Sequence, residues 1–230
     1  MTATWAAPIS GRTIAPGVPS CQLSGIASGP IRDSFGIIPA SLQDHGDRAL
    51  LNRLFQRNRH EAQALDLYEA IVAQARRPEF YTDLAVPDTI DGRFEMIAMH
   101  AFLVMHRLKT RGTEAEAVSQ QLFDTLIADM DRSLREIGIG DLSVPKHIKK
   151  MAKGLYGRIV SYEKGLNDPN DAVMHAALDR NLYGTVMEVP ERCFEAVTAY
   201  MRREVESLAA QPLDRLVAGH VQFGPPPAIG

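Results

Sequence analysis

The residues of this chain that could carry chemistry are few. His100 and His106 lie six positions apart in an apolar stretch, so they do not share the helix face on which metal-binding histidines four positions apart meet. A buried, hydrogen-bonded His100 is therefore the preferred interpretation. Asp124, Asp129 and Asp131 could offer oxygen ligands to a hard cation, but Asp124 and Asp131 fall opposite the apolar stripe of their segment, where carboxylates are normally solvated. We predict no metal site and no cofactor.

Motifs for nucleotide binding or catalysis are absent from the sequence. It contains no G-x-x-x-x-G-K-[ST], G-x-G-x-x-G, H-E-x-x-H, G-x-S-x-G or C-x-x-C pattern. We therefore predict that the protein is not an enzyme. A helical metal-dependent hydrolase, with His100 or the Asp129/Asp131 pair in a buried site, is the alternative, because catalytic groups can meet in space without a sequence motif.

Cationic residues are concentrated in one predicted helix, over residues 145–164. At about 100° per residue, its apolar residues fall on one side and most of its lysines on the opposite side. We define the basic strip as Lys146, Lys149, Lys150, Lys153, Arg158 and Lys164. A solvated face without a partner is the simpler interpretation, and an anionic partner is the functional one. Gly154 and Gly157 disfavour helix and suggest a close backbone approach, within the molecule or to a partner.

A second cationic segment, residues 47–59, reads as a basic amphipathic helix. It carries four arginines, no acid after Asp47, and four large apolar residues that fall on one side of a helix. This pattern is typical of a helix that lies on an anionic membrane surface, and docking onto the rest of the protein is the equally weighted alternative. The predicted membrane-surface residues are Arg48, Leu50, Leu51, Arg53, Leu54, Phe55, Arg57 and Arg59.

The elements that must position these residues are all helices. Between the two ends of the chain, six segments repeat apolar residues with a period of 3.6, and none alternates with period two. We predict an all-α fold, a compact multi-helix bundle at residues 60–211. Residues 1–46 and 212–230, rich in Pro and Gly, are predicted to be disordered tails. Asp91 is the expected N-cap of a central helix that runs to about Lys109.

Charge and composition exclude several classes of protein. With 25 Lys+Arg against 28 Asp+Glu, the net charge of −3 argues against specific DNA binding, because DNA-coating proteins carry a basic surplus. Two distant cysteines exclude a disulfide framework. No apolar run reaches the roughly 18 residues of a membrane span, and the first residues lack the pattern of a secretory signal. We expect a cytoplasmic protein.

Three runs of sequence resemble the ubiquinol-cytochrome c chaperone family. They are FYTDLAVPDTIDGRFE at residues 80–95, LFDTLIADMDRSLREIGIGDLSVPK at residues 122–146, and MAKGLYGR at residues 151–158. The resemblance spans roughly residues 60–205. It implies a non-enzymatic chaperone that binds newly made cytochrome b and assists assembly of ubiquinol-cytochrome c reductase, peripheral to the inner membrane. It also implies the ribosome tunnel-exit region and a small partner chaperone as partners.

Taken together, these patterns give one preferred mechanism and one further alternative. The basic strip and the segment 47–59 would hold the protein beside a membrane or ribosome, while a groove between helices shelters apolar client segments. Met96, Met99, Met105 and Met130 could line such a groove, although ordinary core packing is the favoured interpretation. A nucleic-acid-binding helical regulator, using the same strip, is the alternative, and it predicts binding that weakens steeply with salt.

Overall fold

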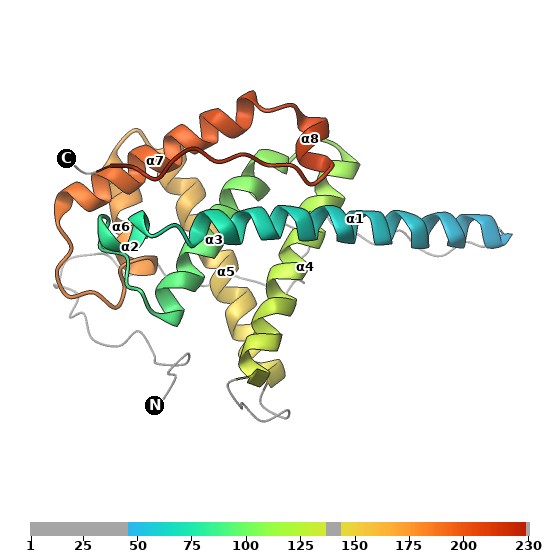
Figure 1. The fold of residues 1–230 in the computed structure, drawn as a ribbon, viewed down its shortest axis with the longest axis horizontal. Helices are drawn as coiled ribbons and strands as arrows, with labels where there is room; N and C mark the ends of the chain where they lie inside the picture. Colours follow the sequence, from blue (N-terminus) through green and yellow to red (C-terminus); the bar gives the residue numbers. More distant parts are fainter. Residues whose placement is uncertain (1–45, 137–143, 229–230) are drawn as a thin grey trace, which may run out of the picture.

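The computed structural model describes residues 46–136 and 144–228, with backbone alone at 46–58, 134, 144–145, 147, 150 and 151. These ranges hold helices and no strand, which confirms the predicted all-α fold (Figure 1). The predicted tail at residues 1–46 lies outside the described residues except for Gly46. The helices are α1 Gly46–Ala75, α2 Glu79–Thr82, α3 Ile90–Leu108, α4 Thr113–Glu136, α5 Val144–Asn167, α6 Asp171–Asn181, α7 Glu191–Ala210 and α8 Leu213–Val217.

Helix α3 is the centre of the bundle, as its apolar sequence predicts. It contacts α1, α4, α5, α7 and α8, and most of its side chains are buried. Its N-cap is Thr89 rather than Asp91, because the Thr89 hydroxyl accepts the Gly92 N–H at 3.1 Å. A side chain at Gly92 would place its Cβ 2.0 Å from the Pro87 carbonyl oxygen. The chain can therefore turn from Pro87 into α3 only with glycine at this position.

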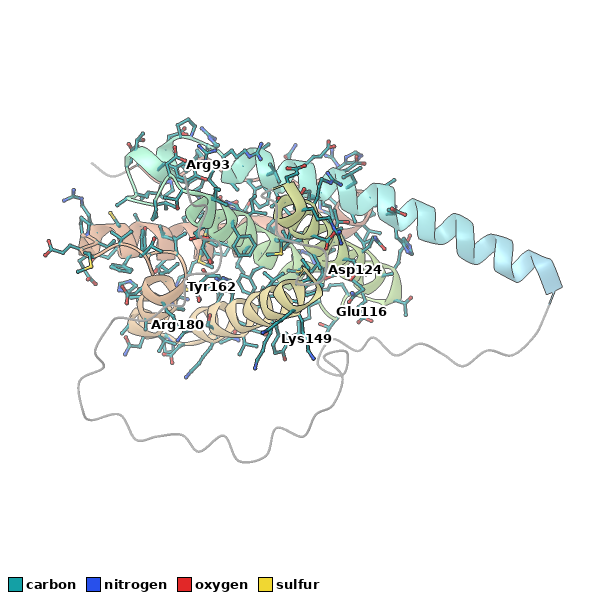
Figure 2. The ribbon with its side chains drawn as sticks, turned by 90° about the horizontal axis from the view of Figure 1, so that it is seen from below. Arg93, Glu116, Asp124, Lys149, Tyr162 and Arg180 are labelled. Carbon is teal, nitrogen blue, oxygen red and sulfur yellow. The ribbon has the colours of Figure 1, made fainter. Side chains whose placement is uncertain are left out.

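Helix α1 is continuous where the sequence suggested two segments that meet near residue 59. No proline or glycine separates the basic segment 47–59 from the buried stripe that follows, so nothing in the local sequence ends the helix there. The second half of α1 buries Leu67, Ile71 and Ala75 against α3 and α4. Its first half projects past the other helices in both views (Figures 1 and 2).

The prediction that residues 212–230 form a disordered tail is wrong for residues 213–228. These residues pack against the other helices. Within α8, Leu216 and Val217 are buried. The segment after α8 runs back along α7 as an extended chain (dark red in Figure 1). We call residues 219–228 the C-terminal strap. Its proline-rich sequence has no helical period, yet side chains of α1 and α7 bind its backbone.

The strap is fastened mainly at Gly224. Gln74 of α1 donates to the Gly224 carbonyl oxygen at 2.8 Å, and the Gly224 N–H donates to the Glu204 carboxylate of α7 at 3.0 Å. The Phe223 ring meets the His100 ring edge to face, with 5.3 Å between centroids. Gln211 bonds both the N–H and the carbonyl oxygen of Gln222, at 3.0 and 2.7 Å. Polar side chains therefore satisfy backbone groups that no helix or sheet satisfies, and two of them, Gln74 and Glu204, are buried.

Glu204→Ala is expected to loosen the strap and cost about 2 kcal/mol of the free energy of unfolding. The Glu204 side chain is fully buried, and the substitution leaves the Gly224 N–H without its charged acceptor. Chemical denaturation measures the loss, and limited proteolysis within residues 220–228 reports release of the strap. Glu206→Ala, at an exposed position of the same helix, is the control and should change neither. Unchanged proteolysis of Glu204→Ala would contradict the assigned role of this carboxylate.

Candidate functional site

The outer face of α5 carries exposed lysines. Four of the predicted basic-strip residues have exposed side chains there, and none forms an ion pair with a carboxylate of the described residues. We call them the lysine ridge: Lys146, Lys149, Lys153 and Lys164. Lys149 marks this outer face of α5 in Figure 2. The opposite face of the helix buries Leu155, Ile159 and Tyr162 in the core, which fixes the direction in which the ridge points.

Arg158, the remaining described residue of the basic strip, lies elsewhere. Its side chain is 18% exposed and forms a two-pronged ion pair with Glu95 of α3, with Nε 2.6 Å from Oε2 and Nη2 in contact with Oε1. The guanidinium also lies 5.5 Å from the centroid of the Phe94 ring. Arg158 therefore joins α5 to α3 and is not part of the lysine ridge. Lys150 of the strip has no described side chain.

The Glu95–Arg158 pair is the most buried pair of opposite charges among the described ion pairs. Burial raises the pKa of the Glu95 carboxyl, and the hydrogen bond and charge of Arg158 oppose that rise. Burial lowers the pKa of Arg158, but the hydrogen bond and charge of Glu95 outweigh it and keep this pKa above its ordinary value. Gly154 leaves room for this guanidinium, because an added Cβ would lie 3.0 Å from Arg158 Nη1.

The sequence does indicate that Arg158 differs from the lysines of the basic strip, although counting positive charges along α5 groups them together. Arg158 follows Leu155 by three positions and precedes Tyr162 by four, so it shares the edge of the buried stripe rather than the lysine side. Helical spacing could therefore have separated Arg158 from the lysines. The identity of its partner, 63 residues earlier in the chain, had no local signal.

The predicted membrane-surface residues lie in the projecting half of α1. Of these eight residues only Arg59 has a described side chain; it is exposed and lies 3.3 Å from the Glu114 carboxylate of α4. The backbone of this half is helical, as predicted, and it projects past the other helices (Figure 1). In the described parts of the chain, no helix combines the length and apolar character of a membrane span.

His100 is a structural residue, as predicted. Its ring is fully buried, with Nδ1 2.7 Å from the Met96 carbonyl oxygen and Nε2 2.8 Å from the Tyr200 hydroxyl. Gln74 donates to the same hydroxyl at 3.0 Å. The Met96 carbonyl can only accept, so Nδ1 carries the proton and Nε2 accepts from Tyr200. Both ring nitrogens are engaged, and burial lowers the pKa of His100 to about 4 despite the bond to Met96.

The aspartates of α4 serve separate contacts. Asp129 accepts a hydrogen bond from the Tyr68 hydroxyl of α1 at 2.8 Å, while Asp131 pairs with Arg135 one turn along at 2.7 Å. Asp124 is exposed. Within residues 46–136 and 144–228, no three His, Cys, Asp or Glu side chains are placed to hold a metal ion. Neither His100 nor the Asp129/Asp131 pair therefore gives the hydrolase alternative a supporting geometry.

The four methionines considered as groove residues are core residues. Met96, Met99, Met105 and Met130 are each at most 3% exposed. Of the two cysteines, Cys193 is a buried free thiol, and Cys21 lies outside the described residues. A small hollow opens between α3 and α5, lined by Phe102, Met105, His106, Lys109, Ile159 and Glu163. The apolar groove for client segments therefore stays a prediction without assigned residues.

Comparison with known proteins points to a single family. A family model described as ubiquinol-cytochrome C chaperone matches residues 82–223. Ubiquinol-cytochrome-c reductase complex assembly factor 1 of Xenopus laevis is 24% identical over 163 residues, which cover 70% of this chain and 80% of that protein. The Homo sapiens protein named ubiquinol-cytochrome c reductase complex assembly factor 1 is also 24% identical over 163 residues, covering 70% of this chain but 54% of its own length.

Two further matches carry a different name. Protein CBP3, mitochondrial, of Saccharomyces cerevisiae is 24% identical over 151 residues, which cover 64% of this chain and 44% of the yeast protein. The crystal structure of the Cbp3 homolog from Brucella abortus superposes with a TM-score of 0.67 at 37% identity, covering 77% of this chain and 96% of that one. The likeness therefore extends from sequence to the arrangement of the helices.

Proposed function

The chain belongs to the ubiquinol-cytochrome C chaperone family, and from this premise we propose that it is a non-enzymatic chaperone that assists assembly of ubiquinol-cytochrome c reductase. Relatives from frog and human are named assembly factors of that complex. The client in this proposal is newly made cytochrome b. The protein binds it at the membrane, with the ribosome tunnel-exit region and a small partner chaperone as further contacts.

The observation that carries this proposal is the lysine ridge. Its four exposed cations have no carboxylate partner among the described residues, on a protein whose net charge is −3. Long-range attraction through such a ridge speeds encounter with an anionic partner and orients the complex. The buried side of α5 makes the ridge a rigid surface, since its backbone is fixed by the core. The ridge is the proposed contact with the partner protein or the ribosome.

The projecting half of α1 is the proposed membrane contact. Its four arginines, near an anionic leaflet, would contribute about 4 kcal/mol at most, which alone corresponds to roughly millimolar binding. Partial burial of its four large apolar residues adds the remainder, since each contributes about 1.5 to 3 kcal/mol when fully buried. In this proposal the protein is peripheral to the inner membrane on the cytoplasmic side, and its attachment is reversible.

Crosslinking in cells during synthesis of cytochrome b tests the chaperone function. We expect cytochrome b to be captured by the wild-type protein, and capture to fall at least tenfold when Lys146, Lys149, Lys150 and Lys153 are all replaced by Glu. Lys146, Lys149 and Lys153 are exposed on α5, so the variant should keep its thermal unfolding temperature. Failure of the wild-type protein to capture cytochrome b would contradict the assigned client.

The matched control changes the same amount of charge elsewhere. Four exposed arginines lie away from the ridge, on the turn after α1, on the turn before α4, on α7 and on α8: Arg76, Arg111, Arg192 and Arg215. Replacing all four with Glu shifts the net charge as far as the lysine variant does. Capture should survive this control if the ridge is a specific contact. Equal loss in both variants would mean that net charge alone decides capture.

The lysine ridge also favours a second candidate, a nucleic-acid-binding regulator. Four phosphate contacts would make the logarithm of the binding constant fall with the logarithm of salt concentration by a slope of about 3 to 4. Titration of the protein with RNA and with duplex DNA, at salt concentrations between about 50 and 200 mM, measures this slope. A slope of that size, without capture of cytochrome b, would favour the regulator over the chaperone.

A further inference from the structure

The three glycines of α5 have different surroundings. At Gly154 an added Cβ would meet Arg158 Nη1 at 3.0 Å, and at Gly165 it would lie 2.9 Å from the Met174 Cα of α6. These two glycines therefore make room for contacts inside the molecule. At Gly157 an added Cβ would find no atom within 4 Å, and the residue is exposed.

Glycine at position 157 weakens the helix without an internal reason. Glycine in a helix interior is less favourable than alanine because it loses more backbone freedom on folding. No side chain or backbone of the described residues occupies the space that an alanine methyl would take. The missing side chain therefore leaves the helix backbone uncovered toward solvent, where another molecule can approach it closely.

The surroundings of Gly157 indicate what would approach. Val160, 48% exposed, lies three positions further along the same face. Lys153 and Lys164 flank the two on that face, eleven residues and therefore roughly 16 Å apart. The uncovered backbone at Gly157 and the apolar side chain of Val160 thus lie between two lysines. This order, apolar in the middle and charged at the rim, is that of a protein interface, whereas phosphates would gain nothing from an exposed valine.

We propose that Gly157 and Val160 are the seat for an acidic helix of a partner protein, which packs across the lysine ridge. The partner helix places a small or apolar residue over Gly157 and carboxylates near Lys153 and Lys164. Without a Cβ at position 157, the two helix axes can lie closer than the usual 8 to 10 Å. The inference rests on the proposed function, because it specifies how a chaperone partner would use the ridge.

Substitution of Gly157 separates stability from binding. Gly157→Ala should raise the thermal unfolding temperature by about 2 to 4 °C, because alanine favours helix and nothing blocks its methyl. The same change should weaken partner capture, and Gly157→Leu should reduce it at least tenfold while the protein stays folded. Ala199→Leu, at an exposed position of α7, adds comparable bulk on another helix and should leave capture unchanged. An unfolding temperature that does not rise in Gly157→Ala overturns the premise.

Capture is measured on the full chain in cells, with the photoreactive residue p-benzoylphenylalanine in place of Val160. The crosslinked peptides are mapped by mass spectrometry. Support requires adducts within an acidic helical segment of another protein, and their loss with Gly157→Leu but not with Ala199→Leu. Adducts only to RNA, only to lipid or to nothing overturn the inference, as does equal yield with Gly157→Leu. If Gly157→Leu has no effect while the lysine variant still loses cytochrome b, the inference fails and the proposed function stands.

Discussion

Replacing Arg158 with alanine should cost about 3 to 5 kcal/mol of the free energy of unfolding, the loss typical of removing one partner from a buried ion pair. The Glu95 side chain is only 8% exposed, so the variant leaves a carboxylate in the core without its counter-charge. The guanidinium also contacts the Phe94 ring, and that packing is lost as well. Urea denaturation followed by circular dichroism measures the change. A loss below 1 kcal/mol would show that water reaches Glu95 and replaces Arg158.

The double variant Glu95→Met, Arg158→Met is the control. Replacing a buried pair with apolar side chains of similar size removes both charges together and is often neutral or stabilising. We therefore expect it to regain most of the stability lost in Arg158→Ala. If the double variant is as unstable as the single one, packing rather than charge explains the loss.

The loss in Arg158→Ala should also depend on pH. Without Arg158, the pKa of the Glu95 carboxyl rises further, because burial already raises it and the opposing charge is gone. A carboxyl whose pKa is higher in the folded than in the unfolded state binds its proton more tightly when folded, so stability falls as pH rises. The variant should therefore differ least from wild type near pH 5 and most at pH 8.

Acidification should destabilise the wild-type protein through His100 by about 3 kcal/mol between pH 6.5 and pH 4. Burial lowers the pKa of His100 from 6.5 to about 4 in the folded protein, so in this interval the unfolded chain binds a proton that the folded one does not. The stabilisation is fully present above pH 6.5 and is lost as pH falls toward 4. Protonation of Nε2 would also remove the acceptor of the hydrogen bond that the Tyr200 hydroxyl donates.

A variant without the imidazole isolates this contribution from that of the carboxylates. His100→Gln cannot titrate, so its stability should fall less steeply than that of wild type between pH 6.5 and pH 4, although it is less stable at neutral pH. His220→Gln, at an exposed position, should keep the wild-type slope. Denaturation midpoints over this pH range measure both. Identical slopes in wild type and His100→Gln would contradict the assigned role of His100.

Periodicity alone predicted the long helices and the two faces of α5, but not the short helices α2 and α8. The apolar surroundings of α3 and the opposed lysines of α5 follow from spacing within one helix, which the local sequence determines. The N-cap of α3 was misplaced by two residues because Thr89 and Asp91 are both good caps, and only the turn at Pro87 and Gly92 decides between them.

Contacts between distant segments could not be predicted from the sequence. The partner of Arg158 is 63 residues away and that of Gln74 is 150 residues away, and neither distance leaves a local pattern. The strap shows the difficulty most clearly. A segment rich in proline and glycine, with no helical period, is disordered only if no side chain elsewhere in the protein binds its backbone. In this protein Gln74, Glu204 and Gln211 bind the backbone of the strap.

The strap also sets the order in which the protein can finish folding. Gln74 leaves a ribosome long before Gly224 is made, and until then the Gln74 amide and the Glu204 carboxylate lack their hydrogen bonds to Gly224. Closing a loop of 150 residues is slow compared with forming helices. During synthesis the His100 ring is therefore not yet covered by Phe223. Until the strap docks, α1 and α3 can assemble with the surface around His100 still open on the side that Phe223 later covers.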